Sequence, residues 1–178
     1  MNTLSLNCRG LGSPDSRRAL RSLIWREAPA LVFLCDTKLG GRDMRRIIDE
    51  IDGFDGLDVA GIGRLGGLGG LGFLWQQDID RNFVSSSAHH MDFLIKGVDG
   101  EWRVTGFYRW RVVSDRHLSW ELLRDLSRQS TVPWLCIGDF HEILFYIAMQ
   151  RGNRQQWQMA NFRVAFQACS PRDVPCVC

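Results

Sequence analysis

Four polar residues follow apolar, strand-like runs in this sequence, each at the point where its run ends. They are Asn7 after "LSL", Asp36 after "LVFLC", Tyr108 after "VTGF" and Asp139 after "WLCIG". In layered α/β folds, ligands bind beyond one end of the strands, where the loops converge. Two carboxylates, a carboxamide and a phenol gathered there would suit Mg²⁺ or Mn²⁺ better than zinc. Any one of the four alone is explained by the frequency of Asp and Asn where strands turn, so only the set indicates a site.

The elements that must position these residues alternate between strand-like and helix-like patterns. Ser13 as N-cap and Pro14 at the first helical position mark the first helix. The predicted strands cover residues 3–7, 31–35, 57–62, 71–75, 81–87, 90–97, 101–108 and 132–137. The predicted helices cover residues 13–28, 42–51, 114–130 and 155–168. This order predicts an α/β fold in which helices cover sheets, with a single domain over residues 1–178.

Glycines are expected to end or connect several of these strands. Asp99–Gly100 is a hairpin signal, and Gly138 is expected to end the strand over residues 132–137. The stretch "GIGRLGGLGGLGFLW" (61–75) contains a GxGxxG-like string. A dinucleotide-binding loop opens a helix, whereas these glycines lead into a strand, so we interpret them as a strand connection.

The composition is that of an ordinary soluble globular protein and gives only a weak indication of a partner. The formal net charge is +2, and all of the 22 cations except Lys38 and Lys96 are Arg. Arg presents a planar fork of donors that matches phosphate, although codon usage or solvated helix faces explain the same bias. No apolar run reaches the roughly 18 residues of a membrane span, and no signal peptide follows Met1, so we expect an intracellular protein with no membrane partner.

The six Cys residues form no CxxC pair, and the four His residues lack the spacing of zinc ligands. We expect all six Cys to be free thiols and predict no zinc site. Most of the seven Trp residues, including Trp25, Trp75 and Trp134, lie in patterns typical of a core. The stretch "FYRWR" (107–111) could contact a DNA backbone or anchor a loop.

Taken together, several stretches resemble the endonuclease/exonuclease/phosphatase superfamily. They are "SLNCRGLG", "PALVFLCDTK", "GFYRW" and "WLCIGDFHEIL", and they occur in the family's order and spacing over essentially the whole chain. More narrowly, they resemble the apurinic-endonuclease-like domain of plant LINE-type (non-LTR) retrotransposons. The resemblance implies a four-layer, DNase-I-like α/β sandwich that cuts DNA phosphodiester bonds with Mg²⁺ or Mn²⁺, in the nucleus if active. It gives no oligomeric state.

The resemblance also implies roles for individual residues. Asn7 and Asp36 match the family's metal-site asparagine and acid, and Tyr108 matches the tyrosine that contacts the scissile phosphate. Asp139 matches the aspartate that orients or deprotonates the attacking water, and His141 matches the asparagine that holds the phosphate. A metal, positioned donors and a base together would support in-line attack of water on phosphorus.

Three features depart from the family pattern. Asp36 stands where the family has Glu, which withdraws the carboxylate by about 1.5 Å, the length of one carbon–carbon bond. His141 replaces a neutral Asn. The chain ends on "SPRDVPCVC", before the family's final Asp-His pair, so we expect a fold truncated at the C-terminus, and His89, His90 and His117 match no motif that would replace that histidine.

Three functional hypotheses therefore stand. The first is a metal-dependent DNA endonuclease domain of a retroelement, impaired or inactive in this chain. The second is a non-catalytic remnant that retains at most weak nucleic-acid binding through its arginines. The third is a phosphatase of the same superfamily.

Overall fold

The computed structural model describes residues 1–60, 69–110 and 112–140. These fall into two compact units. One comprises Met1–Tyr108 with Val132–Asp139, and the described part of the other comprises residues 109–131 and Phe140. His141 and the helix predicted over residues 155–168 lie outside the described residues. No helix among the described residues has both the length and the apolar character needed to cross a membrane.

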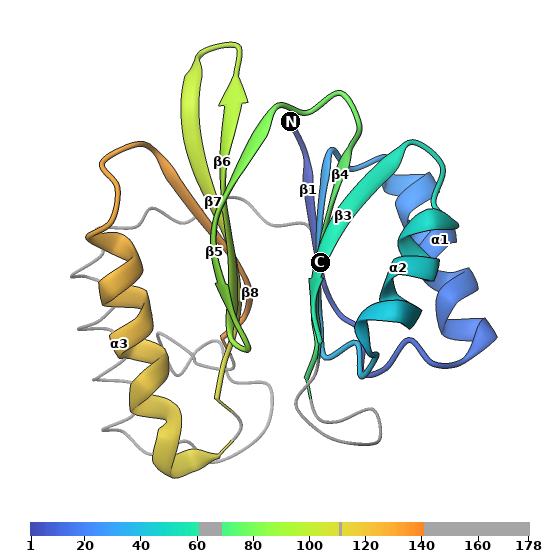
Figure 1. Ribbon diagram of the computed structural model, residues 1–178, viewed down its shortest axis with the longest axis horizontal. Helices are drawn as coiled ribbons and strands as arrows, with labels where there is room; N and C mark the ends of the chain where they lie inside the picture. Colours follow the sequence, from blue (N-terminus) through green and yellow to red (C-terminus); the bar gives the residue numbers. More distant parts are fainter. Residues whose placement is uncertain (61–68, 111, 141–178) are drawn as a thin grey trace, which may run out of the picture. The chain divides into compact units, whose positions relative to one another are not determined.

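Within the described residues, the first sheet of the larger unit has four strands in the order β1-β2-β4-β3. The strands are β1 (Thr3–Asn7), β2 (Leu31–Cys35), β3 (Phe54–Val59) and β4 (Leu71–Gln76). β1 and β2 are parallel, whereas β4 runs antiparallel to both β2 and β3. The helices α1 (Pro14–Glu27) and α2 (Gly41–Asp49) cover one face of this sheet, as Figure 1 shows.

Local sequence signals explain where α1 begins and which side it buries. Ser13 is the N-cap, and its side chain accepts a hydrogen bond of 3.1 Å from the Ser16 N–H, while Pro14 occupies the first helical position. Leu20 and Ile24, one turn apart, are its buried residues. They join Val32, Leu34 and residues of α2 in a core between this sheet and its helices.

The second sheet has the order β5-β6-β7-β8. Its strands are β5 (Arg81–Ser87), β6 (His90–Gly97), β7 (Gly100–Tyr108) and β8 (Trp134–Asp139). β5, β6 and β7 are antiparallel neighbours, and β8 joins β7 in parallel. Gly97 pairs with Gly100 across the β6–β7 hairpin, so Val98 and Asp99 form the turn, and Gly100 has a φ of +121°.

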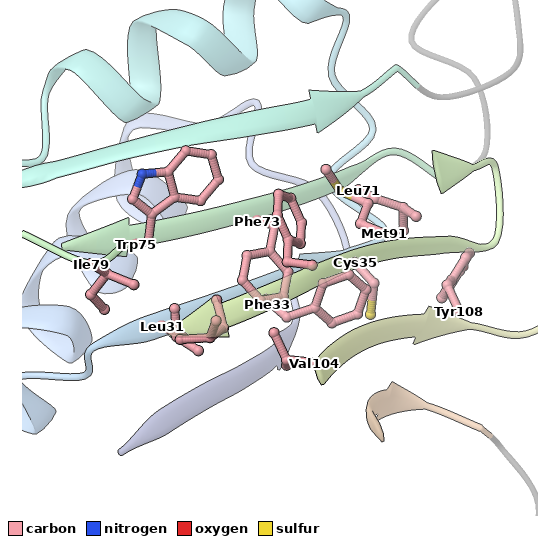
Figure 2. Packing of buried hydrophobic residues seen from close by; sticks show 12 residues of the cluster. Leu31, Phe33, Cys35, Leu71, Phe73, Trp75, Ile79, Met91, Val104 and Tyr108 are labelled. Atoms are coloured by element: carbon pink, nitrogen blue, oxygen red, sulfur yellow. The ribbon is translucent and has the colours of Figure 1, made fainter. Parts of the chain in front are cut away.

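The two sheets pack face to face over a second core, which is rich in aromatic residues (Figure 2). Alternate residues of β2, namely Leu31, Phe33 and Cys35, point into this core and are almost fully buried. A Cβ at Gly106 of β7 would lie 2.1 Å from the Phe33 ring, so this glycine makes room for the ring between the sheets. Because one strand serves two cores, β2 is apolar at every position.

The smaller unit contains a short 3-10 helix, Val113–Asp115, followed by α3 (Arg116–Ser127). Trp120, Leu123 and Leu126 are buried residues of α3. Ser119 of α3 accepts a hydrogen bond of 3.2 Å from the Trp110 N–H through its hydroxyl, which ties the start of this unit to its helix.

The α/β sandwich predicted from the sequence is confirmed, with three local corrections. β3 begins at Phe54 and ends at Val59, three residues earlier at each end than predicted. β8 continues through Gly138 to Asp139, so Gly138 does not end the strand. Trp25 was expected in the core but is 86% exposed on α1.

Candidate active site

The candidate site lies at the carboxyl ends of two parallel strand pairs. In β1–β2 the last register pair is Asn7 with Cys35, and Asp36 follows directly. In β7–β8 the last register pair is Tyr108 with Asp139. Parallel pairing brings the ends of neighbouring strands to the same edge, so the four predicted site residues occupy equivalent places in the two sheets.

A hydrogen bond joins the two sheets at this edge. The Nδ2 of Asn7 donates to the Oδ2 of Asp139 over 2.7 Å, across 132 residues of sequence. β1 lies alongside β8, the edge strand of the other sheet, which makes the contact possible. The Oδ1 of Asn7 accepts a longer bond of 3.2 Å from the Arg9 N–H. The Asn7 amide therefore orients one carboxylate oxygen of Asp139.

Gly138 determines where Asp139 lies. Its φ is +135°, in the region that favours glycine, and a Cβ would fall 2.0 Å from the carbonyl oxygen of Phe107 on β7. A glycine is needed here because any side chain would push β8 away from β7. The strand therefore continues in register for one further residue, and Asp139 is placed opposite Tyr108.

The loops after β1 and β2 run side by side and hold Asp36 in place. The N–H groups of Gly10 and Leu11 each donate to the next loop, to the carbonyls of Asp36 and Thr37, over 2.9 Å. Asp36 has a φ of +54°, a left-handed conformation that is uncommon outside glycine. Such backbone conformations persist where the surroundings over-determine them, and they concentrate at functional sites.

Negative charge accumulates around these strand ends. The Asp36 side chain is buried, with the Lys38 Nζ 3.9 Å from its Oδ2. Burial, followed by the charge of Asp36, raises the pKa of the Cys8 thiol to about 12. Burial also raises the pKa of Cys35 strongly, and the charges of Asp139, Cys8 and Asp36 add to the effect. Both carboxylates are therefore close enough to Cys35 to act on its thiol.

Tyr108 is largely buried and belongs to the core between the sheets. Figure 2 shows it at the end of the cluster where Cys35 lies, away from Trp75 and Ile79. On its other side it meets His89: the Tyr108 N–H donates to the His89 carbonyl over 2.8 Å, and the His89 Nδ1 lies 3.0 Å from the Tyr108 carbonyl. A carbonyl only accepts hydrogen bonds, so the Nδ1 of His89 carries a proton.

The structure thus brings Asn7 and Asp139 together, places Asp36 directly after Cys35, the register partner of Asn7, and places Tyr108 opposite Asp139 in the β7–β8 register. His141 lies outside the described residues. Two neighbours of the site were not predicted. Lys38 was overlooked because it follows the strand by three residues. His89 was set aside for lack of a motif, yet the β6–β7 register, in which His90 pairs with Phe107, puts it next to Tyr108.

The donors at this edge fit a hard divalent cation in their chemistry. Two carboxylates and a carboxamide are oxygen ligands of the type that Mg²⁺ and Mn²⁺ prefer. The part of the chain that the structure describes holds no group of three or more His, Cys, Asp or Glu residues placed to bind a metal ion.

Comparisons with known proteins find the same fold among solved structures. The sequence matches no protein-family model and no curated protein. Solved structures match it well: an AP endonuclease from Leishmania major has a TM-score of 0.71 at 14% identity, covering 94% of this chain. An AP endonuclease from Archaeoglobus fulgidus has a TM-score of 0.64 at 14% identity, covering 96% of this chain.

A third solved structure, an endonuclease/exonuclease/phosphatase family protein from Bacteroides thetaiotaomicron, has a TM-score of 0.55 at 14% identity and covers 79% of this chain. The chain therefore shares the α/β sandwich fold of these three proteins. It spans 66%, 70% and 61% of the lengths of these three proteins, respectively.

Proposed function

We propose that this chain is a divalent-metal-dependent phosphodiester hydrolase domain that acts on DNA as an endonuclease. The observation that carries the proposal is the hydrogen bond between Asn7 and Asp139, which joins the carboxyl ends of two parallel strand pairs. The likeness of the fold to two AP endonucleases supports DNA as the substrate.

In this proposal Asn7 and Asp36 would hold Mg²⁺ or Mn²⁺. When bound, the cation would neutralise negative charge that develops on the phosphate and on the leaving oxygen. Asp139, oriented by the Asn7 amide, accepts a proton from the attacking water, which then forms a bond to phosphorus as the P–O bond to the leaving group breaks. Tyr108 and His141 would contact the phosphate.

We further propose that the domain derives from a retroelement of the plant LINE type. The ordered stretches "SLNCRGLG", "FLCDTK", "GFY" and "GDFHEI" support this origin. A parent protein of that kind would nick target DNA in the nucleus to prime reverse transcription.

A second candidate function, non-catalytic binding of nucleic acid, is favoured by the surroundings of Asp36. Its carboxylate is one methylene shorter than the Glu of the resembled family, and the Lys38 ammonium lies 3.9 Å from it. A cation this close competes with a metal ion for the same oxygen. We therefore expect any hydrolysis to be slow and to require millimolar metal.

The test is nicking of supercoiled plasmid DNA by the full chain, with Mg²⁺ or with a chelator. We expect relaxed circles to appear only with Mg²⁺, and the Asp139→Ala variant to be inactive. Asp125→Ala, which removes an exposed carboxylate from α3, is the matched control and should retain nicking. Nicking that survives Asp139→Ala would overturn the assignment. A folded protein that binds DNA without cutting it would establish the second candidate instead.

A further inference from the structure

A groove of about 290 Å³ lies on the larger unit, away from the candidate active site. Its walls include Arg45, Asp55, Leu57, Trp75, Arg81 and Phe83. β3 and β5, which supply Leu57 and Phe83, are edge strands of the two sheets as far as the structure describes them. The active-site strands β1 and β8 form the opposite edges, so the groove is separate from the proposed catalytic residues.

Large apolar side chains are exposed to solvent at the rim of the groove. Phe83 is 52% exposed and Leu57 is 43% exposed, and Val84 next to Phe83 is also exposed. The inner edge of Phe83 packs against Phe93, with ring centroids 5.6 Å apart. An exposed aromatic ring held in one orientation beside a groove is typical of an interaction surface.

The two arginines that line the groove make different contacts. Arg45 is paired with both Asp49 and Asp55, at 2.9 and 3.0 Å. The Arg81 guanidinium instead stacks on the Trp75 ring, 4.4 Å from its centroid, and forms no ion pair with any residue that the structure describes. Stacking holds the plane of the guanidinium but leaves the donors at its edge available to an anion.

We propose that this groove binds an extended segment of a partner protein in which a carboxylate side chain adjoins an apolar one. The carboxylate accepts two hydrogen bonds from the edge of Arg81, and the apolar side chain packs against Phe83 and Leu57. β5 offers a free edge to such a segment, because it pairs only with β6 in the described sheet. The edge of β3 is less open, since the Gly56 N–H already donates to the Asp55 carboxylate over 2.7 Å.

The charges around the groove favour a peptide over a nucleic acid. Asp49 and Asp55 outnumber Arg45, so Arg81 only restores local neutrality. Nucleic-acid binding depends on several cations that neutralise successive phosphates, which this surface lacks. A single carboxylate beside an apolar group needs only one cation and one apolar contact.

The experiment is selection of a random displayed peptide library on the full chain, followed by affinity measurement on synthetic peptides from the selection. We expect the selected peptides to share an Asp or Glu next to a large apolar residue. Arg81→Glu should weaken their binding about tenfold or more, as should replacing the peptide acid by its amide. Phe83→Ser should also weaken binding, whereas Arg26→Glu on α1, an equal change of charge at an exposed site, should not.

Three results would overturn the inference: no selected consensus, equal binding to Arg81→Glu and to the parent chain, or tighter groove-dependent binding of a single-stranded oligonucleotide than of any peptide. Circular dichroism checks that each variant is folded. Plasmid nicking by Arg81→Glu should equal that of the parent chain, because Arg81 has no part in the proposed hydrolysis.

Discussion

The side chains of Asn7 and Asp139 meet at 2.7 Å although the two residues belong to different sheets. Each is the last residue of its strand, and each of these strands is parallel to its neighbour. The amide donates to the carboxylate, so Asp139 is held in one orientation by a group that does not change its charge.

Asn7→Ala should reduce any metal-dependent nicking by about 10²-fold, the usual effect of removing one oriented donor from an active site. Because Asn7 is exposed, the unfolding free energy should change little. Initial rates of plasmid nicking, at saturating Mg²⁺, measure the effect. Asn82→Ala on β5 removes an exposed carboxamide elsewhere and serves as the control. A rate equal to that of the parent chain would show that Asp139 does not depend on Asn7.

Gly138→Ala should destabilise the fold by about 1–3 kcal/mol, because a side chain is strained at this φ and the new Cβ would overlap the Phe107 carbonyl. Urea unfolding measures the loss. Gly12→Ala is the matched control, since nothing lies within 4 Å of its Cβ, and it should be close to the parent chain. Equal stability of the two variants would contradict the proposed close approach of β8 to β7.

Asp92→Ala should be far more destabilising, by about 3–5 kcal/mol, because it breaks a buried ion pair. Asp92 is fully buried on β6, and its carboxylate accepts a hydrogen bond from the Arg103 Nε–H at 2.9 Å and one from the Thr105 hydroxyl at 2.7 Å. Chemical unfolding again gives the value. Asp80→Ala, which removes the partner of the exposed Lys96, should have a much smaller effect. If both variants lost similar amounts of unfolding free energy, burial of the ion pair would not determine the cost of breaking it.

His90 should make stability fall in mildly acidic solution. Burial lowers the pKa of His90 below its ordinary value. The negative charge of Asp92 raises this pKa by a smaller amount, and the positive charge of Arg103 lowers it further. As the pH falls, His90 therefore takes up a proton in the unfolded state before it does so in the folded state. The contribution of neutral His90 to the unfolding free energy is complete above about pH 6.5 and is lost as the pH falls through the folded-state pKa. Unfolding free energies at pH 7.5, 6.5 and 5.5 test this.

His90→Gln is the comparison for that series. It keeps a polar side chain near Ser85 and Ser87, whose hydroxyls lie 3.0 and 2.8 Å from the two imidazole nitrogens. The variant is expected to be less stable at pH 7.5 but to lose less stability on acidification. A parent chain with a flat pH profile between 7.5 and 5.5 would refute the role of His90.

The sequence predicted elements well where a strong local pattern exists. β2 was predicted at its observed bounds because it is apolar throughout. The start of α1 was predicted to within one residue because Ser13 and Pro14 mark it. β3 was displaced because "FDG" at its start looks like a turn. Trp25 was misplaced because it follows Ile24 in the helix, and the next residue along lies about 100° around the axis, outside the buried stripe.

The candidate site was predictable only as a list of strand ends. That Asn7, Asp36, Tyr108 and Asp139 end strands follows from apolar runs, but no local pattern indicates that β1 lies alongside β8. The place of His89 beside Tyr108 likewise depends on the antiparallel register of β6 and β7. The role of Gly138 could not be predicted from the sequence, because it depends on how closely Phe107 of the neighbouring strand approaches it.

The order of the strands along the chain has a consequence for how the molecule is made. All strands that the structure describes in the sheet containing β1 lie before Gln77, whereas the sheet containing β8 needs residues up to Asp139. During synthesis the first sheet and its two helices have all their residues while β8 does not yet exist, and domains of this kind tend to fold from the N-terminus. Contacts between residues so distant in sequence form slowly. Pairing of Asn7 with Asp139 should therefore be among the last events of folding, and the proposed active site should form only at that late stage.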